Sequence, residues 1–170
     1  MGCTTNGQTY GLYLNTVNWG VVSGCSFTTD PSSGNSLYAT GACQHWKFVG
    51  CEFASGTGGG YGVNIVSSTV QGLVFSGCEV AVSTFGLVSA GTDIVINGCN
   101  FNNNTNVDID LQSGASKHLI VGNILQSSGS AFSIVESSGA DYTLVGSNMI
   151  KGSVSLTGSH STQNNNMAIT

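Results

Sequence analysis

The chain has 170 residues, of which only eight are acidic and three are basic, so its formal net charge is −5. All three basic residues are lysines, so the chain lacks the basic patch and the arginine forks by which proteins bind phosphate, which excludes nucleic acid as a partner. Hydrophobic residues make up 40% of the sequence, yet no apolar run approaches the roughly 18 residues of a membrane-spanning helix. These features predict one folded domain over residues 1–170, without a membrane partner.

A seven-residue pattern occurs six times along the chain. Its copies are VVSGCSF (21–27), KFVGCEF (47–53), VFSGCEV (74–80), VINGCNF (95–101), LIVGNIL (119–125) and TLVGSNM (143–149). When the copies are aligned on their shared glycines, they lie 26, 27, 21, 24 and 24 residues apart. Such spacings are typical of solenoids, in which each repeat stacks on the one before it.

Each copy of the pattern predicts two strands joined by a bend. One large apolar residue lies three positions before the residue that follows the glycine, and another lies two positions after it. Because strand side chains alternate in direction, both can point inward only if the chain bends between them, and glycine permits such a bend. The residues that follow the glycines then stack in an interior column, which we call the ladder: Cys25, Cys51, Cys78, Cys99, Asn123 and Ser147.

A second recurrent strand separates these copies. It starts at Leu12 and returns around Leu37, Val63, Leu87, Ile109, Ile134 and Val154. Residues 1–9 form a polar lead-in and residues 159–170 a polar tail, and no repeat is predicted in either. Two segments, 28–36 and 54–62, are predicted to be loops that leave one corner of the rod. They form either a binding site or surface loops without a role in binding.

An all-β chain of strand, tight bend, second strand and looser turn resembles the right-handed parallel β-helix family, which includes pectate-lyase-like enzymes and many phage virion proteins. The resemblance covers residues 12–156. It implies one rod of about six to seven coils, roughly 34 Å long at the spacing of adjacent strands. It indicates the fold rather than a function, because one scaffold carries many different sites.

Four of the six cysteines are ladder residues. Stacked in register, they act as small apolar fillers, so we interpret them as buried free thiols of a protein that matures in a reducing compartment. Disulfides are the alternative, because the number of cysteines is even. The CxxC and HxxC spacings of zinc sites do not occur, and we predict neither a metal nor a cofactor.

Two pairs of acidic residues are candidates for chemistry. Glu52 and Glu79 each follow a ladder cysteine, so we expect them on adjacent coils about 5 Å apart, where a pair can serve retaining glycoside hydrolysis or bind a cation. Asp108 and Asp110 are predicted to face outward from one strand. The resemblance to pectate-lyase-like enzymes implies an arginine or lysine base beside calcium-binding acids, and this chain has no arginine. We therefore assign no catalytic residue, and Glu52 and Glu79 stay weak candidates for a polysaccharide depolymerase.

The outward face of the glycine-pattern strands carries apolar residues where polar ones are expected. Val21, Val74, Val95, Leu119 and Val121 form this apolar stripe, together with Val49 and Val145. Monomers seldom expose a contiguous apolar patch of more than a few hundred Å², so we predict that the stripe is a subunit contact. A homotrimer of parallel rods covers it in every copy at once. The alternative is that these residues face inward.

The combination of few charges, an apolar outward stripe and an incomplete catalytic set favours a non-enzymatic structural protein of a phage virion. It would be a trimeric β-helix that decorates or cements the capsid, contacts the major capsid protein or other virion proteins, and is assembled in the host cytoplasm. The alternative is a tailspike or tail-fibre β-helix that binds or depolymerises a host surface polysaccharide. A secreted pectinolytic enzyme is disfavoured, because the start MGCTTNGQTY lacks the features of a signal peptide.

Overall fold

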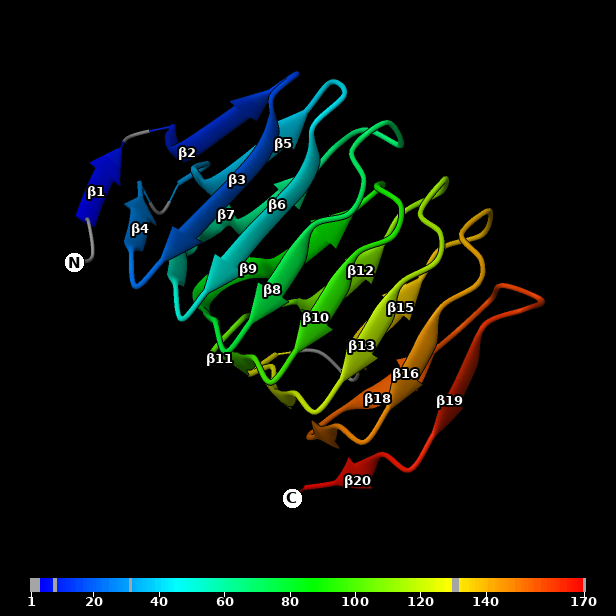
Figure 1. Cartoon of the computed structure of the whole chain (residues 1–170). Helices are drawn as coiled ribbons and strands as arrows, with labels where there is room; N and C mark the ends of the chain where they lie inside the picture. Colours follow the sequence, from blue (N-terminus) through cyan, green and yellow to red (C-terminus); the bar gives the residue numbers. More distant parts are fainter. Residues whose placement is uncertain (1–3, 8, 31, 130–131, 170) are drawn as a thin grey trace.

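The computed structural model describes residues 4–7, 9–30, 32–129 and 132–169. These residues form strands and the turns between them, and none of them is helical (Figure 1). In this part of the chain, therefore, no helix has the length and apolar character needed to span a membrane. The strands stack into a rod with the two ends of the chain at opposite ends of the rod (Figure 1). The predicted all-β solenoid is confirmed.

One face of the rod is a seven-stranded parallel sheet built from the first half of each repeat. Its strands are β3 (Asn18–Ser23), β6 (Gln44–Val49), β8 (Val74–Ser76), β10 (Val95–Asn97), β13 (Leu119–Val121), β16 (Leu144–Gly146) and β19 (Thr162–Asn164). Their spatial order follows the sequence from β3 to β19. Each turn of the solenoid therefore adds one strand to this sheet.

The other two faces are the arms of a 13-stranded sheet. The first arm contains β1 (Thr4–Gly7), β4 (Ser26–Thr29), β11 (Asn100–Asn102), β14 (Ile124–Gln126), β17 (Met149–Ile150) and β20 (Met167–Ala168). The second arm contains β2 (Tyr10–Asn15), β5 (Asn35–Thr40), β12 (Val107–Leu111), β15 (Phe132–Glu136) and β18 (Ser153–Ser155). Two long strands, β7 (Glu52–Ile65) and β9 (Glu79–Ser89), run through both arms and join them.

The glycine bend connects the seven-stranded sheet to the first arm. The bend glycines adopt left-handed backbone angles, with φ of 60° at Gly24, 58° at Gly50 and 60° at Gly77. An L-residue in this conformation costs about 1 to 2 kcal/mol, which explains why glycine recurs here. A Cβ at any of these three glycines would have no heavy atom within 4 Å, so backbone strain and not crowding selects glycine.

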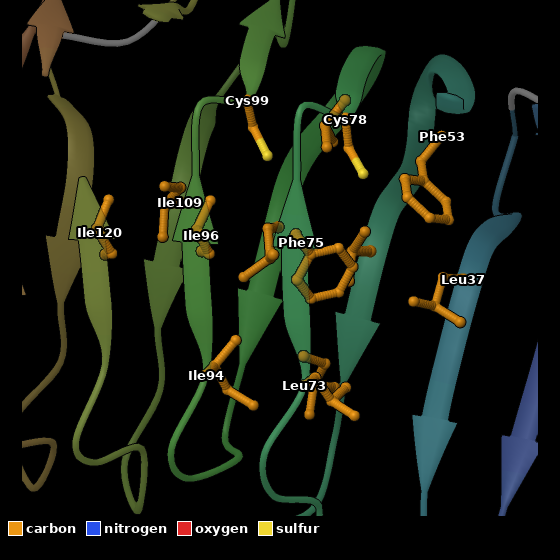
Figure 2. Packing of buried hydrophobic residues seen from close by; sticks show 14 of the residues in the cluster. Leu37, Phe53, Leu73, Phe75, Cys78, Ile94, Ile96, Cys99, Ile109 and Ile120 are labelled. Carbon is orange, nitrogen blue, oxygen red and sulfur yellow. The ribbon is translucent and has the colours of Figure 1, made fainter. Parts of the chain in front are cut away.

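The core lies between the three faces, and the predicted inward side chains fill it (Figure 2). Phe48, Phe53 and Phe75 come from three different strands and are at most 1% exposed. The rings of Phe48 and Phe75 stack with centroids 5.0 Å apart, and Phe53 meets Phe75 edge-on at 6.1 Å. Aromatic packing in these two geometries adds to the stability that burial alone provides.

Cys51, Cys78 and Asn123 make the same hydrogen bond to the preceding turn although their chemistry differs. The Cys78 Sγ donates to the carbonyl oxygen of Phe48 at 3.4 Å, and the Asn123 Nδ2 donates to the equivalent carbonyl oxygen of Ile96 at 3.0 Å. Cys43, Cys51, Cys78 and Cys99 are free thiols, and Cys3 lies outside the described residues. Thiol and amide are thus alternative ways to satisfy a carbonyl group at one interior corner.

The prediction of Ser147 as the sixth ladder residue is wrong. Asn148 occupies the ladder instead, and its Nδ2 donates to the carbonyl oxygen of Ile120 at 3.0 Å. Ser147 takes the left-handed conformation of the bend glycine, with φ of 55°. Gly146, on which the sixth copy was aligned, pairs with Val121 and lies one residue before the bend.

This shift reverses the facing of the residues around it. Val145 is fully buried, so its predicted place in the apolar stripe is wrong, and Leu144 is outward instead with 39% of its surface exposed. After the bend, Ile150 points into the core in place of Met149. One misplaced glycine in the alignment therefore exchanged inward and outward positions throughout the sixth copy.

Three segments differ from the predicted organisation. The lead-in contributes β1, which pairs with β4 of the next turn. The polar tail continues the solenoid, because β19 pairs with β16 and β20 pairs with β17. It even contains a seventh bend, at Asn165 with φ of 51°, followed by the ladder residue Asn166. The segment 54–62, predicted as a loop, lies within β7, whose pairing with β9 is irregular between Gly56 and Tyr61.

A buried carboxylate ties the C-terminal turn to the rod. Glu136 is 1% exposed and accepts hydrogen bonds from Thr143 Oγ1 at 2.8 Å and from Ser161 Oγ at 2.7 Å. It also accepts bonds from the backbone N–H groups of Thr157 at 2.9 Å and Gly158 at 2.8 Å. Four donors satisfy this carboxylate, as a buried acidic group requires.

Replacing Phe75 with alanine should lower the free energy of unfolding by about 3 to 5 kcal/mol, because it removes a fully buried ring from between two others. Urea denaturation followed by circular dichroism measures the change. Val66→Ala, at a 40% exposed valine, is the matched control and should cost no more than about 0.5 kcal/mol. A cost below about 1 kcal/mol for Phe75→Ala would contradict the core described here.

Candidate functional site

Glu52 and Glu79 lie side by side, as the sequence predicts. They are direct partners in the parallel pairing of β7 and β9, and both side chains are exposed. The Glu52 Oε2 accepts a hydrogen bond from Ser26 Oγ at 2.8 Å. Together with the bend glycines they line a groove of about 440 Å³ at the edge of the seven-stranded sheet, which we call the acidic groove.

The acidic groove does not contain the partners that a catalytic carboxylate pair would need. Among the described residues, no lysine, arginine or histidine lines it, so none of them places a cationic base beside the two acids. Among the described residues no cluster of three or more histidine, cysteine or acidic side chains could hold a metal ion. This groove presents two exposed carboxylates beside the bend glycines and small side chains such as Ser26 and Cys25. A catalytic role for either glutamate stays a prediction.

The prediction that Asp108 faces outward is wrong. Its side chain is fully buried, where Oδ1 accepts a bond from Asn104 Nδ2 at 2.9 Å and Oδ2 accepts one from the backbone N–H of Ser127 at 2.9 Å. Burial raises the pKa of this carboxyl to about 7, against the lowering effect of its hydrogen bonds. Val107 and Asp108 are both buried, so strict alternation fails at the start of β12. Asp110, in contrast, is partly exposed as predicted.

The apolar stripe lies on the outward face of the seven-stranded sheet. Val74, Val95 and Leu119 are direct partners in the pairing of β8, β10 and β13, so their side chains form a continuous column. Each is partly exposed, and Val21 at the N-terminal end is 70% exposed. Val121 lies in the parallel outward column beside them. Their role as a subunit contact stays a prediction.

A family model described as the right handed beta helix region matches residues 2–149, which is most of the chain. The chain belongs to the right-handed β-helix family. The match includes all six copies of the repeat found in the sequence. Comparison with curated proteins and with solved structures gives no match. Membership in the family defines the fold, so the role of this β-helix has to be argued from its surfaces.

A second corner of the β-helix brings together residues that the sequence did not single out. Where the chain enters the seven-stranded sheet, successive turns again adopt left-handed angles, at Trp19, His45, Gly72, Asp93, Lys117 and Tyr142. Trp19 is 74% exposed, and its ring stacks on that of His45 with centroids 4.2 Å apart. These two rings, Lys47 and the stripe residues Val21 and Val74 line a groove of about 560 Å³, which we call the aromatic groove. No residue type recurs along this corner, so the repeat pattern gave no signal of it.

The second arm also carries aromatic side chains on its outward face, and these were missed as well. Tyr13 and Tyr38 stack with centroids 5.6 Å apart, and Tyr61 stacks on Phe85 at 5.3 Å. Tyr10 completes this tyrosine face, with its ring 5.1 Å from both Tyr13 and Tyr38. A groove of about 390 Å³ beside Tyr61 and Phe85 also contains Asp110, whose pKa is raised by burial. Their columns hold other residue types in neighbouring repeats, such as Asn35 between Tyr10 and Tyr61 and Asn64 after Tyr38, which concealed the face.

His118, to which the sequence assigned no role, is an interior residue of this β-helix. It is 2% exposed, and its Nε2 lies 3.1 Å from Ser89 Oγ while its Nδ1 lies 2.9 Å from the carbonyl oxygen of Ser116. Burial lowers its pKa to about 4, so the ring is neutral at pH 7. A neutral, hydrogen-bonded and water-excluded histidine serves packing rather than catalysis.

The buried Asp108 should make stability depend on pH between about pH 4 and pH 7. Because its folded pKa, about 7, is above the ordinary value of 3.8, its contribution is complete below about pH 4 and is lost as pH rises towards 7. The wild type should therefore lose about 4 kcal/mol over this range relative to Asp108→Asn, which cannot ionise. Urea denaturation of both proteins at several pH values measures the difference. A constant difference from pH 4 to pH 7 would contradict the assignment.

Proposed function

We propose that this protein is a non-enzymatic structural component that assembles as a homotrimer through the apolar stripe. We further propose that it belongs to a phage virion, where it decorates or cements the capsid and contacts the major capsid protein. The observation that carries the proposal is the row of partly to fully exposed aliphatic side chains on one face of a chain that has very few charges.

The stripe favours a partner that is parallel to the rod. Val74, Val95 and Leu119 stack directly along it, and Leu144 pairs with Leu119 to extend the same column by one turn. Only Lys47 interrupts the column, between Val21 and Val74. A partner of the same shape and length matches such a column along its whole length, and a closed three-fold arrangement leaves none of the three stripes open to water.

The absence of a built catalytic site in the described residues favours a structural role. Glu52 and Glu79 are open to water and lack a cationic partner, whereas Asp108 and His118 are sealed inside the rod. Catalytic acids and bases need access to substrate together with a tuned environment, and none of these four residues combines the two.

A second candidate function is binding of a host surface polysaccharide, as in a tailspike or tail fibre. The tyrosine face favours it specifically, because Tyr10 and Tyr13 are 41% and 48% exposed and the stacked pair Tyr61 and Phe85 borders a groove with the polar side chain of Asp110. Exposed aromatic rings beside hydrogen-bonding groups suit ligands that have both apolar and polar faces.

The purified protein should be a trimer at micromolar concentration, and Val95→Asp should remain folded but dissociate, because assembly would bury an unpaired charge. Light scattering coupled to size-exclusion chromatography measures the mass. Val82→Asp is the control, since Val82 is 44% exposed at the corner between the two arms, and this variant should assemble like the parent. A monomeric parent, or a trimeric Val95→Asp variant, would refute the proposed assembly.

Location and abundance on particles separate the two candidate functions. Quantitative mass spectrometry of purified phage particles that encode this chain should find a copy number near that of the shell protein if it decorates or cements the capsid. A copy number of a few trimers per particle would instead favour the tail, where the tyrosine face would contact polysaccharide. Failure to find the chain in intact particles would overturn both.

A further inference from the structure

The acidic and aromatic grooves lie at opposite edges of the seven-stranded sheet, in the same turns of the rod. β3, β6 and β8 begin beside the aromatic groove, which Trp19, His45 and Gly72 line in three successive turns. The same strands end beside the acidic groove, in front of Gly24, Gly50 and Gly77. Both grooves are therefore at the same height along the rod, towards its N-terminal end.

The two grooves carry opposite charge, and within the part of the chain that the structure describes neither charge has an oppositely charged partner. Lys47 is the one lysine, arginine or acidic side chain among the described residues that line the aromatic groove, and the acidic groove contains Glu52 and Glu79. The described residues contain one ion pair, between His160 and Asp141, so Lys47 has no carboxylate within 4.0 Å. Two like charges paired directly across adjacent strands are unfavourable on their own, and a cation between them removes that cost.

The shapes of the grooves also correspond. Trp19 and His45 form a projecting aromatic stack, held by left-handed backbone angles that cost about 1 kcal/mol or more in each residue. The acidic groove has a floor of Gly24, Gly50 and Gly77, where no side chain stands above the backbone. A flat ring can lie on such a floor, with its polar edge towards a carboxylate.

The apolar stripe by itself is too small for a stable assembly. Two outward columns about 7 Å apart and seven strands long cover roughly 240 Å² at ordinary strand spacings. A standard stable interface buries about 800 Å² per partner, so residues at the two edges of the sheet have to contribute. The two grooves are what lies at those edges in the N-terminal turns.

We infer that in the trimer the aromatic groove of each subunit docks onto the acidic groove of the next. The inference rests on the proposed homotrimer. A three-fold axis parallel to the rod, with the seven-stranded sheets facing it, places the leading edge of one sheet against the trailing edge of its neighbour without any shift along the rod. Lys47 and Glu52 belong to the same turn, so the lysine of one subunit meets Glu52 of the next, and Trp19 lies on the glycine floor beside it.

A charge exchange tests this docking, because Lys47 and Glu52 would be partners only between subunits. Lys47→Glu and Glu52→Lys should each raise the dissociation constant of the trimer by about tenfold or more, and the double variant Lys47→Glu with Glu52→Lys should restore most of the affinity. Lys151→Glu is the matched control, because it alters net charge as Lys47→Glu does at an exposed lysine outside both grooves, and it should assemble like the parent. Sedimentation equilibrium measures the constants, and circular dichroism confirms that each variant is folded.

Trp19→Ala should weaken assembly to a similar extent, whereas Trp19→Phe, which keeps a flat ring, should weaken it less. Single charge variants that assemble like the parent, or a double variant as weak as the singles, would overturn the docking while the trimer itself stands. A parent that is monomeric under all conditions would overturn the docking together with the proposed function.

Discussion

The in-register parallel pairing between successive turns is the constraint on which the rest of this structure depends. Because each residue pairs with its equivalent one turn later, as Val95 does with Val74 and Leu119, any side chain placed at a position is stacked on its own counterparts. Inward columns must then be apolar or fully hydrogen-bonded, and outward columns become continuous surfaces. The phenylalanine stack, the ladder, the apolar stripe and the glutamate pair are all products of this one geometric rule.

The same rule explains why most of the fold could be predicted from sequence. Large apolar residues at a fixed distance from glycine, such as Phe75 and Ile96, identified the inward columns, and stacking then determined which residues share a face. The prediction failed in the sixth copy, where the glycine used for the alignment does not occupy the bend. Gly146 stands one position before the bend and Ser147 adopts the left-handed angle, so an alignment on glycine displaced the whole sixth copy.

The surfaces were predicted less completely, and the reasons are physical. The left-handed corner before the seven-stranded sheet accepts tryptophan, histidine, glycine and charged residues alike, because its side chains point to water and packing does not select them. Trp19 therefore left no periodic signal. The outward prediction for Asp108 was wrong for the opposite reason, because this side chain is buried. Asn104 and Ser127 donate hydrogen bonds to its carboxylate inside the rod, and a pattern of apolar and polar residues does not reveal such an interior acid.

The four hydrogen-bond donors around Glu136 affect the order in which the turns of the rod unfold. In a solenoid each turn contacts only its neighbours, so the ends should fray first, one turn at a time. Glu136 in β15 receives bonds from Thr143 and from three residues near the start of the last turn, Thr157, Gly158 and Ser161. Local unfolding of that turn would expose the buried carboxylate to water or leave it without its hydrogen-bond donors. These hydrogen bonds stabilise the C-terminal turn, so local unfolding should begin at the opposite end of the rod.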